Sequence, residues 1–534
     1  MSLLAVENLN ISIGPIPILH KIALTVAPGE IVAITGESGS GKSMTALAIM
    51  GLLPEAAVAT GRITLEETDL LALSEPELCT IRGRQIGMVF QEPMSALNPV
   101  QTIGAQVAET IRIHENIPKS EALARARVVL NRVGLPEDRF PLTRYPHELS
   151  GGQRQRVVIA MAIALRPKLL LADEPTTALD VTTQARILAL LQDLTTEFGM
   201  GLLMITHDLA VVAEMADRIV VMQKGRVVES GETARLLSDM QHPYTRALFA
   251  ASAHKADLPI PPPPEPLLKL EHVVRSYKQP RRDLFGPRPE MRAVDDVSFT
   301  LNRGERLGLV GESGCGKSTL TRAILGLEPV QAGTITLNGA PVWAENRPNL
   351  AVRRQMQVVF QDPYGSFNPR HRVSRLIAEP FYLLPNPPQG EVRARKIAEA
   401  LEAVGLAASD AKKFIHEFSG GQRQRIAIAR ALINDPDLIV FDEAVSALDV
   451  SVRAQVLDLL ADLCRRRPLS YLFISHDLNV VRTITDRVMV MQAGKIVEHG
   501  TTEDVFNNPQ HRYTKTLLAA APQLPDIRSF ADAP

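Results

Sequence analysis

The stretch Gly36-Glu-Ser-Gly-Ser-Gly-Lys42-Ser43 decides the fold, and Gly311-Glu-Ser-Gly-Cys-Gly-Lys317-Ser318 repeats it later in the chain. Both stretches fit G-x-x-x-x-G-K-[ST], in which glycines let successive backbone N–H groups surround a polyphosphate. The lysine of this pattern meets the β and γ oxygens, and the final hydroxyl binds Mg²⁺. The sequence therefore predicts two loops that each bind a nucleotide polyphosphate together with Mg²⁺.

The residues on either side of each loop support this interpretation. An apolar run comes before each loop, at residues 30–35 and 306–310, and a helix-compatible run follows, at residues 44–50 and 319–325. Strand, glycine-rich loop and helix in this order point the N-terminus of the helix at the phosphates. This shared context favours functional loops over chance matches and predicts an α/β fold.

Composition sets limits on partners and compartment. The chain has 534 residues, with 58 basic and 59 acidic side chains and a net charge of −1, so no overall attraction to nucleic acid or to an anionic membrane is expected. The three cysteines form no C-x-x-C pair, which predicts neither a disulfide framework nor a zinc or iron–sulfur site. The N-terminus does not resemble a signal peptide, and no apolar run approaches the length of a membrane span. We expect a soluble protein of a reducing cytoplasm that can still dock on a membrane partner.

Further polar motifs follow the first loop. A helix that begins at Ser150-Gly-Gly-Gln153 would present free N–H groups and a hydroxyl to a γ-phosphate. Asp173 and Glu174 end an apolar strand, where Asp173 suits the Mg²⁺ shell and Glu174 suits the polarisation of an attacking water. His207 ends the next strand. A single histidine is more often a packed core residue, but its place at the same sheet edge favours contact with the γ-phosphate.

The same motifs occur a second time. The pairs Ser150 and Ser419, Asp173 and Asp442, Glu174 and Glu443, and His207 and His476 are each separated by 269 residues. One domain is therefore encoded twice, and the repeat is too long for a solenoid unit. We expect a first domain at residues 1–255, a linker at 256–267 and a second domain at 268–534. The proline-rich linker is interpreted as a stiff spacer, with a docking peptide for an aromatic groove as the alternative.

The ordered motifs resemble those of the ATP-binding cassette (ABC) superfamily over nearly the whole chain. The matching residues are the Walker A lysines Lys42 and Lys317, the Q-loop glutamines Gln91 and Gln361, the signature residues 150–153 and 419–422, the Walker B pairs Asp173-Glu174 and Asp442-Glu443, the D-loop residues Asp180 and Asp449, and the switch histidines His207 and His476. The resemblance implies two tandem ABC-type P-loop NTPase domains. Each would combine a mixed-sheet RecA-like core with an antiparallel β subdomain and an α-helical signature subdomain.

The resemblance also implies an ATPase whose two halves pair head to tail, with each ATP between the Walker A of one half and the signature of the other. The catalytic residues expected are Glu174, His207, Glu443 and His476. The metal ligands expected are Ser43, Gln91, Asp173, Ser318, Gln361 and Asp442. The ATP-binding residues expected are Gly36, Ser38, Gly39, Gly41, Lys42, Ser43, Met44, Gln91, Ser150, Gly151, Gly152, Gln153, Tyr277, Gly311, Ser313, Gly314, Gly316, Lys317, Ser318, Thr319, Gln361, Ser419, Gly420, Gly421 and Gln422.

Two segments in each half indicate which subgroup of the ABC superfamily the chain resembles. Residues 90–99 and 360–369 resemble the Q-loop segment of oligopeptide, dipeptide and nickel importer ATPases, and His242-Pro-Tyr-Thr245 and His511-Arg-Tyr-Thr514 resemble their C-terminal motif. The fusion of two ATPases is similar to that in microcin C type peptide importers. The resemblance implies two separate membrane permease subunits, a periplasmic binding protein, and a position on the cytoplasmic face of the bacterial inner membrane.

A soluble tandem ABC ATPase that acts on ribosomes, of the ABC-F type, is the alternative function. Such proteins join their cassettes with a long charged helical linker that reaches into RNA. The joint here is short and rich in proline, and the charge is balanced, which disfavours contact with RNA. The sequence therefore favours the importer ATPase and predicts no nucleic-acid partner.

Two positions distinguish the halves. Tyr277 fits the aromatic residue on which the family stacks adenine, whereas the aligned residue of the first half is Ile13, so weaker ATP binding is expected at the first site unless His20 substitutes.

Cys315 lies inside the second phosphate loop. Because a helix N-terminus favours a thiolate, we expect Cys315 to be reactive, with alkylation that inhibits the ATPase and ATP that protects.

Overall fold

The computed structural model describes residues 2–177, 179–278, 288, 290–345, 347–362, 365–446 and 448–524. The chain divides into two compact units, the first made chiefly of Met1–Leu179 and Thr183–Ala253 and the second chiefly of His254–Ala521. In the described part of the chain, no helix combines the length and the apolar character that crossing a membrane requires.

A six-stranded sheet forms the centre of the first unit, in the order β10-β9-β3-β8-β7-β6. All neighbouring strands are parallel except β10, which pairs antiparallel with β9. The bounds of these strands are Ile31–Thr35 for β3, Ile86–Val89 for β6, Leu169–Asp173 for β7, Gly201–Ile205 for β8, Arg218–Gln223 for β9 and Arg226–Glu232 for β10. Parallel strands align their carboxyl ends at one edge, where ligands bind in open α/β sheets.

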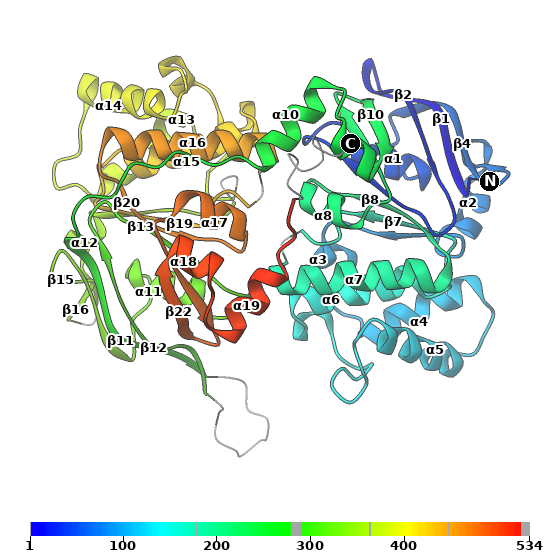
Figure 1. The fold of residues 1–534 in the computed structure, drawn as a ribbon, viewed down its shortest axis with the longest axis horizontal. Helices are drawn as coiled ribbons and strands as arrows, with labels where there is room; N and C mark the ends of the chain where they lie inside the picture. The colour runs from blue at the N-terminus through cyan, green and yellow to red at the C-terminus, as the bar shows by residue number, and fades with distance from the viewer. Residues whose placement is uncertain are drawn as a thin grey trace. The chain divides into compact units, whose positions relative to one another are not determined.

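Alternation along β7 shows how both faces of this sheet are covered. Leu169 and Leu171 belong to one apolar core and Leu170 and Ala172 to another, because successive side chains of a strand point to opposite faces. The first core lies under an antiparallel sheet of β1, β2, β4 and β5 and includes helix α1, whereas the second includes α6 and α7 (Figure 1). The bounds are Leu4–Ile13 for β1, Ile16–Val26 for β2, Ala57–Leu65 for β4, Thr68–Asp69 for β5, Lys42–Ile49 for α1, Gly151–Ile163 for α6 and Val181–Phe198 for α7.

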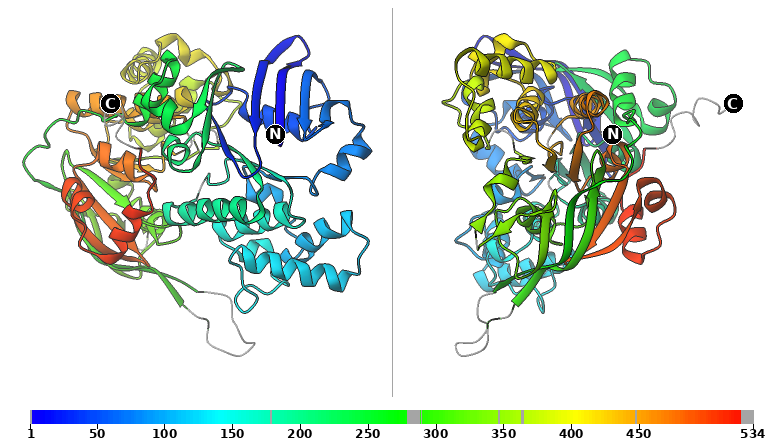
Figure 2. Two further views of the ribbon diagram at one scale, coloured as in Figure 1. Left: turned by 45° about the vertical axis from the view of Figure 1, so that its right-hand side comes forward. Right: turned by 90° about the vertical axis from the view of Figure 1, so that its left-hand side faces the viewer.

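Helices α4 (Ile103–His114) and α5 (Lys119–Arg132) pack together and against α6, and they form the helical subdomain. Figure 2 shows this pair on the opposite side of the unit from β1 and β2. The remaining helices are α2 (Glu75–Ile81), α3 (Pro93–Ala96), α8 (Leu209–Met215), α9 (Thr233–Ser238) and α10 (Pro243–Ser252).

The second unit repeats this plan with a six-stranded sheet in the order β18-β19-β20-β13-β21-β22 and a four-stranded antiparallel sheet in the order β12-β11-β14-β15. Its strands are β11 (Pro266–Lys278), β12 (Glu290–Asn302), β13 (Arg306–Val310), β14 (Ala332–Leu337), β15 (Ala340–Pro341), β16 (Trp343–Ala344), β17 (Arg347–Pro348), β18 (Met356–Val359), β19 (Leu438–Asp442), β20 (Ser470–Ile474), β21 (Arg487–Gln492) and β22 (Lys495–Thr501). Its helices are α11 (Lys317–Ile324), α12 (Leu350–Arg353), α13 (Val373–Ile377), α14 (Gly390–Ala403), α15 (Gly420–Leu432), α16 (Val450–Arg466), α17 (Leu478–Ile484), α18 (Thr502–Asn507) and α19 (Arg512–Ala519). The α/β fold predicted from the sequence, with its antiparallel and helical subdomains, is confirmed in both units.

The proline-rich segment is held by the second unit. The imidazole of His254 lies 2.7 Å from the Asp458 carboxylate, and the Arg465 guanidinium donates to the carbonyl oxygen of Asp257 at 2.7 Å. Arg306, whose side chain is 2% exposed, donates to the carbonyl oxygen of Pro259. Strand β11 already begins at Pro266. The sequence predicts a stiff spacer at residues 256–267. The structure adds specific contacts that attach residues 254–259 to the second unit.

Candidate nucleotide site

In each unit the phosphate loop, the Q-loop glutamine, the acidic pair and the histidine follow strands of the central sheet at its carboxyl edge. In the first unit the phosphate loop follows β3, Gln91 follows β6, Glu174 follows β7 and His207 follows β8. The pairing of Asp173 with Ile205 in the β7–β8 register brings the acidic pair level with the end of β8. In the second unit Asp442 pairs with Ile474 in the same way.

Two glycines of the phosphate loop combine a positive φ angle with a lack of space for a Cβ atom. Gly36 and Gly41 adopt φ angles of 146° and 98°, in the region that disfavours residues with a side chain. A Cβ atom on Gly36 would lie 2.1 Å from the carbonyl oxygen of Met222, and one on Gly41 would lie 2.3 Å from a methyl carbon of Leu19. The loop therefore packs directly on β9 and β2, and its shape depends on the absence of side chains.

The loop lysine is buried against its own loop. Lys42 Nζ donates to the carbonyl oxygens of Gly36 and Glu37, each at 2.9 Å, and Lys317 Nζ does the same with Gly311 at 2.6 Å and Glu312 at 2.9 Å. Both lysine residues are less than a tenth exposed. These bonds hold the ammonium groups inside the curve of each loop, where a polyphosphate would replace carbonyl oxygens with more strongly charged partners.

Ser43 and Asp173 form the part of the site suited to a metal ion. Ser43 Oγ donates to Asp173 Oδ1 at 3.2 Å. Burial raises the pKa of Asp173, against the opposing effects of the Ser43 hydrogen bond and the Lys42 charge. A desolvated carboxylate beside a hydroxyl fits Mg²⁺, which binds proteins through one or two carboxylates together with substrate phosphates.

Three side chains hold the carboxylate of Glu174. Gln91 Nε2 donates to Oε2 at 2.8 Å, Thr177 Oγ1 donates to Oε2 at 2.8 Å, and His207 Nδ1 lies 3.2 Å from Oε1. Burial by itself would raise the pKa of Glu174. The hydrogen bond and charge of His207 and the hydroxyl of Thr177 outweigh burial and lower this pKa to about 2. Glu174 is therefore ionised and fixed in direction, as a general base must be.

The backbone at Glu174 carries conformational strain. Its φ angle is 47°, and that of Glu443 is 53°, in the left-handed region that residues other than glycine seldom adopt. The N–H of Glu174 donates to the carbonyl oxygen of Ile205, and the N–H of Glu443 to that of Ile474, each at 2.9 Å. The neighbouring strand thus holds each glutamate in a conformation that turns its side chain across the sheet edge.

The second carboxylate is held by fewer groups. Within the described residues, the side-chain partner of Glu443 is His476, whose Nδ1 lies 3.4 Å from Oε2. Ser446, which occupies the position of Thr177, donates instead to the backbone carbonyl oxygen of Glu443. Burial opposes the effect, but the hydrogen bond and charge of His476 lower the pKa of Glu443. Burial and the charge of Glu443 raise the pKa of Asp442. Pro363 and Tyr364 of the second Q-loop segment lie outside the described residues.

The signature helices begin as the sequence predicts, at Gly151 and Gly420. Ser150 and Gln153 form a capping box, in which the Gln153 N–H donates to Ser150 Oγ at 3.4 Å and the Ser150 N–H donates to Gln153 Oε1 at 2.9 Å. Ser419 and Gln422 repeat it. A role for these termini in binding a γ-phosphate stays a prediction.

Tyr277 lies at the end of β11, next to charged side chains. Its hydroxyl donates to Glu328, and the guanidinium carbon of Arg275 lies 4.8 Å from the centre of its ring. Among the described residues these are the hydrogen-bond and ring contacts of its side chain, and neither is with the phosphate loop. Adenine stacking on Tyr277 therefore also stays a prediction.

The thiolate expected at Cys315 is opposed by the burial of this side chain. Cys315 is 8% exposed, and its burial raises the pKa of the thiol despite the opposing charge of Lys317. The backbone amides of the helix N-terminus favour a thiolate, but the side chains around Cys315 exclude water and disfavour it. Burial therefore disfavours the expected thiolate, whereas inhibition by alkylation and protection by ATP stay predictions.

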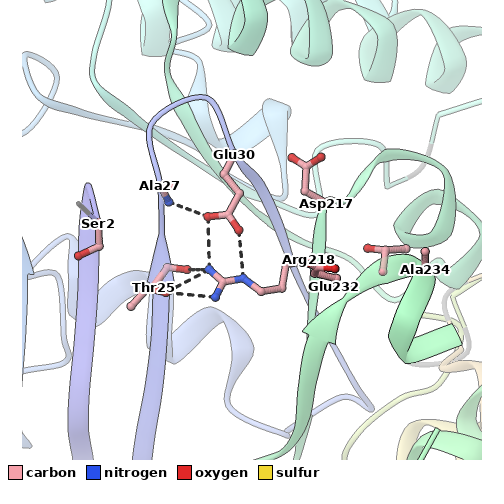
Figure 3. Close-up of a pocket in the computed structure, with 9 residues that line it drawn as sticks. Ser2, Thr25, Ala27, Glu30, Asp217, Arg218, Glu232 and Ala234 are labelled. Atoms are coloured by element: carbon pink, nitrogen blue, oxygen red, sulfur yellow. Dashed lines mark hydrogen bonds and ion pairs between the residues drawn. The ribbon is translucent and has the colours of Figure 1, made fainter. Parts of the chain in front are cut away.

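A surface pocket of the first unit lies at the other edge of the sheet. Figure 3 shows that it surrounds the Arg218 guanidinium, which forms an ion pair with Glu30 at 3.0 Å and a hydrogen bond with Thr25 Oγ1 at 3.1 Å. Glu30 and Arg218 stand at the amino ends of β3 and β9. The pocket of about 720 Å³ is thus separate from the phosphate loop and contains none of the predicted site residues.

Three residues that contact the site, Thr177, Tyr244 and Tyr513, are not among the predicted site residues. Thr177, which donates to Glu174, lies three residues after it, and a threonine at this distance from a strand end was the available signal. Tyr244 and Tyr513 were recognised only as parts of a C-terminal motif, yet their hydroxyl oxygens accept hydrogen bonds from the two phosphate loops.

Comparison with known proteins identifies the family. Residues 19–177 and 294–446 match the ABC transporter family, and residues 228–257 and 497–532 match the oligopeptide/dipeptide transporter C-terminal region. The glutathione import ATP-binding protein GsiA of Escherichia coli (strain K12) is 47% identical over 98% of this chain and 90% of its own length. The protein of the same name from Shigella boydii serotype 4 (strain Sb227) is 46% identical over the same shares. The solved structure of cbiO1 from Clostridium perfringens is 30% identical and covers 45% of this chain and 91% of its own, with a TM-score of 0.40.

The matches cover both units and include the phosphate loops and the acidic strand ends. The chain belongs to the ABC transporter family, as an ATPase with two fused cassettes of the oligopeptide/dipeptide transporter type.

Proposed function

We propose that this chain is the energy-coupling ATPase of an importer for peptides or peptide-like compounds. The observation that carries the proposal is the arrangement found twice, in which a phosphate loop, an acidic pair and a histidine meet at one sheet edge. The C-terminal regions of the oligopeptide/dipeptide type and the relatives named for glutathione import support the peptide-like cargo. Two membrane permease subunits on separate chains and a periplasmic binding protein are the partners, on the cytoplasmic face of a bacterial inner membrane.

In the proposed reaction, Glu174 and Glu443 each accept a proton from the water that attacks the γ-phosphate of ATP. His207 and His476 hold these carboxylates in direction. Lys42 and Lys317 neutralise phosphate oxygens. Bound Mg²⁺, held by Ser43, Asp173 and Gln91 or by Ser318, Asp442 and Gln361, would neutralise charge on the β- and γ-phosphates.

Each ATP is proposed to lie between one half's phosphate loop and the other half's signature. The first site uses Lys42 with Ser419 and Gly421, and the second uses Lys317 with Ser150 and Gly152. A site completed by both halves binds ATP only when they are closed, so ATP shifts the population toward closure. Hydrolysis removes the bridging γ-phosphate and lets the halves separate, which drives the permeases.

Affinity purification of the tagged chain from its native membranes tests the proposal. We expect two integral membrane proteins to be retained, and vesicles that contain the complex to hydrolyse ATP faster when a peptide-loaded binding protein is present. Retention of 70S ribosomes in moderate salt, without membrane proteins, would instead support the translation-factor alternative. A Glu174→Gln/Glu443→Gln chain serves as the control, because it should assemble with the same partners without hydrolysis.

A further inference from the structure

The C-terminal motif of each unit reaches back to the phosphate loop of the same unit. Tyr244, in the first turn of α10, accepts a hydrogen bond at its hydroxyl oxygen from the backbone N–H of Glu37 at 3.0 Å. Tyr513, in the first turn of α19, accepts the equivalent bond from Glu312 at 3.0 Å. Tyrosine and loop residue are separated by 207 and 201 positions, respectively. The first contact lies within the first unit, and the second contact lies within the second unit.

The bonded N–H belongs to the peptide group on which the loop lysine rests. The carbonyl oxygen of Gly36 and the N–H of Glu37 are the two ends of one planar peptide. Lys42 Nζ donates to the carbonyl end at 2.9 Å while Tyr244 accepts from the N–H end. Because the peptide is rigid, the tyrosine hydroxyl fixes the direction in which the carbonyl oxygen meets the lysine. The peptide between Gly311 and Glu312 is held by Lys317 and Tyr513 in the same way.

A separate set of hydrogen bonds fixes the tyrosine. In the first unit the Glu229 carboxylate accepts from the N–H groups of Gln241 at 2.7 Å and His242 at 3.1 Å. His242 Nδ1 then accepts the N–H of Tyr244 at 3.2 Å. The start of α10 is thereby tied to β10, which carries Glu229.

The second unit repeats every part of this arrangement. Glu498 on β22 accepts from Gln510 at 2.6 Å and His511 at 3.0 Å, and His511 Nδ1 accepts the N–H of Tyr513 at 3.2 Å. Tyr513 is 8% exposed, so its hydroxyl has little access to water as a substitute partner. The residue after the histidine differs, being Pro243 in one unit and Arg512 in the other, yet the contact with the loop is the same. The tyrosine hydroxyl is thus the shared functional feature.

We propose that Tyr244 and Tyr513 are positioning residues of the nucleotide sites, which fix the loop peptide that orients Lys42 and Lys317 for the polyphosphate. The C-terminal region of each unit is then part of the site that binds ATP. This inference rests on the proposed role of the loops in ATP binding. A loop held in its binding shape before ATP arrives does not lose further conformational freedom on binding, so the tyrosines should act mainly on affinity.

Removal of only the two hydroxyl groups tests the proposal. In the full chain, Tyr244→Phe/Tyr513→Phe should raise both the KM and the Kd for ATP about fivefold, which corresponds to about 1 kcal/mol, while kcat changes less than twofold. Hydrogen exchange at the peptides that contain Glu37 and Glu312 should become faster. Exchange in the central strands should stay as in the unmodified chain.

Tyr471→Phe is the matched control. Tyr471 is a fully buried tyrosine on β20 whose hydroxyl donates to the backbone carbonyl oxygen of Ile484, so its loss removes a buried hydrogen bond away from the loop. We expect this variant to have a lower Tm and an unchanged KM. The inference is overturned if Tyr244→Phe/Tyr513→Phe keeps the KM of the unmodified chain, or if Tyr471→Phe raises KM as much. Failure of the unmodified chain to bind ATP would instead refute the proposed function.

Discussion

At the scale of single residues, the proposed hydrolysis depends on the ionised carboxylates of Glu174 and Glu443. Replacing either by glutamine keeps the shape of the side chain and removes the base. We expect Glu174→Gln or Glu443→Gln to slow hydrolysis at the affected site by roughly 10²- to 10⁴-fold, with ATP binding retained. Single-turnover phosphate release measures this effect. A double variant that hydrolyses ATP at nearly the normal rate would show that neither glutamate is the base.

The two ATP sites should differ in affinity if Tyr277 of the second half stacks on adenine as predicted, because the aligned residue of the first half is Ile13, unless His20 substitutes. A Lys42→Ala chain reports the second site and a Lys317→Ala chain reports the first. Stacking contributes about 1 to 3 kcal/mol, so titration calorimetry should find ATP bound at least about fivefold more tightly by the Lys42→Ala chain. Adding Tyr277→Ala to that chain should remove the difference. Equal affinities in the two lysine variants would show that Tyr277 does not stack on adenine.

At the scale of elements, the close approach of α15 to α16 depends on Gly421. A Cβ atom on Gly421 would lie 2.2 Å from a methyl carbon of Val452, whereas one on Gly420 would have no atom within 4 Å. We therefore expect Gly421→Ala to lower the free energy of unfolding by about 1 to 3 kcal/mol and Gly420→Ala to leave it nearly unchanged. Urea denaturation of both variants measures this. Equal free energies of unfolding for Gly421→Ala and Gly420→Ala would show that the Val452 side chain can move away without loss of stability.

The attachment of the C-terminal helices should depend on pH. Burial by itself would raise the pKa values of Glu229 and Glu498. Hydrogen-bond donors that include backbone N–H groups outweigh burial and lower both pKa values below the ordinary 4.5. A lowered pKa stabilises the folded chain above about pH 4.5, and this contribution is lost as the pH falls below that value. Glu229→Gln/Glu498→Gln should therefore unfold at a lower urea concentration than the unmodified chain at pH 7, with a smaller difference at pH 4. The exposed Glu55→Gln variant serves as the control, and a difference that grows in acid would contradict the assignment.

The sequence predicted the elements around the site because their signals are local. A strand, a glycine-rich loop and a helix are encoded within about twenty residues around Lys42, and the strand ends place Asp173 and Glu174 at the same edge. The contact of Tyr244 with Glu37 has no such local signal, because its partners are distant in the chain. The burial of Cys315 likewise depends on side chains from other elements, so its place beside a helix N-terminus did not indicate that burial raises the pKa of its thiol.

At the scale of the whole molecule, the duplication fits the proposed reaction, which needs two copies of one site. Each unit supplies a complete phosphate loop, acidic pair and histidine, and each also carries a capped signature helix. In the proposed mechanism, covalent fusion raises the effective concentration of one half near the other, so that ATP would need only to shift an intramolecular equilibrium. The contacts of residues 254–259 with the second unit show that the joint between the halves is attached to one of them.

The most direct test of the central claim is a structure of the Glu174→Gln/Glu443→Gln chain with ATP and Mg²⁺. We predict two ATP molecules, with the γ-phosphate beside Lys42 also contacting Ser419 and the γ-phosphate beside Lys317 also contacting Ser150. Two bound ATP molecules with both serines facing solvent would contradict the claim that each site is shared between the halves.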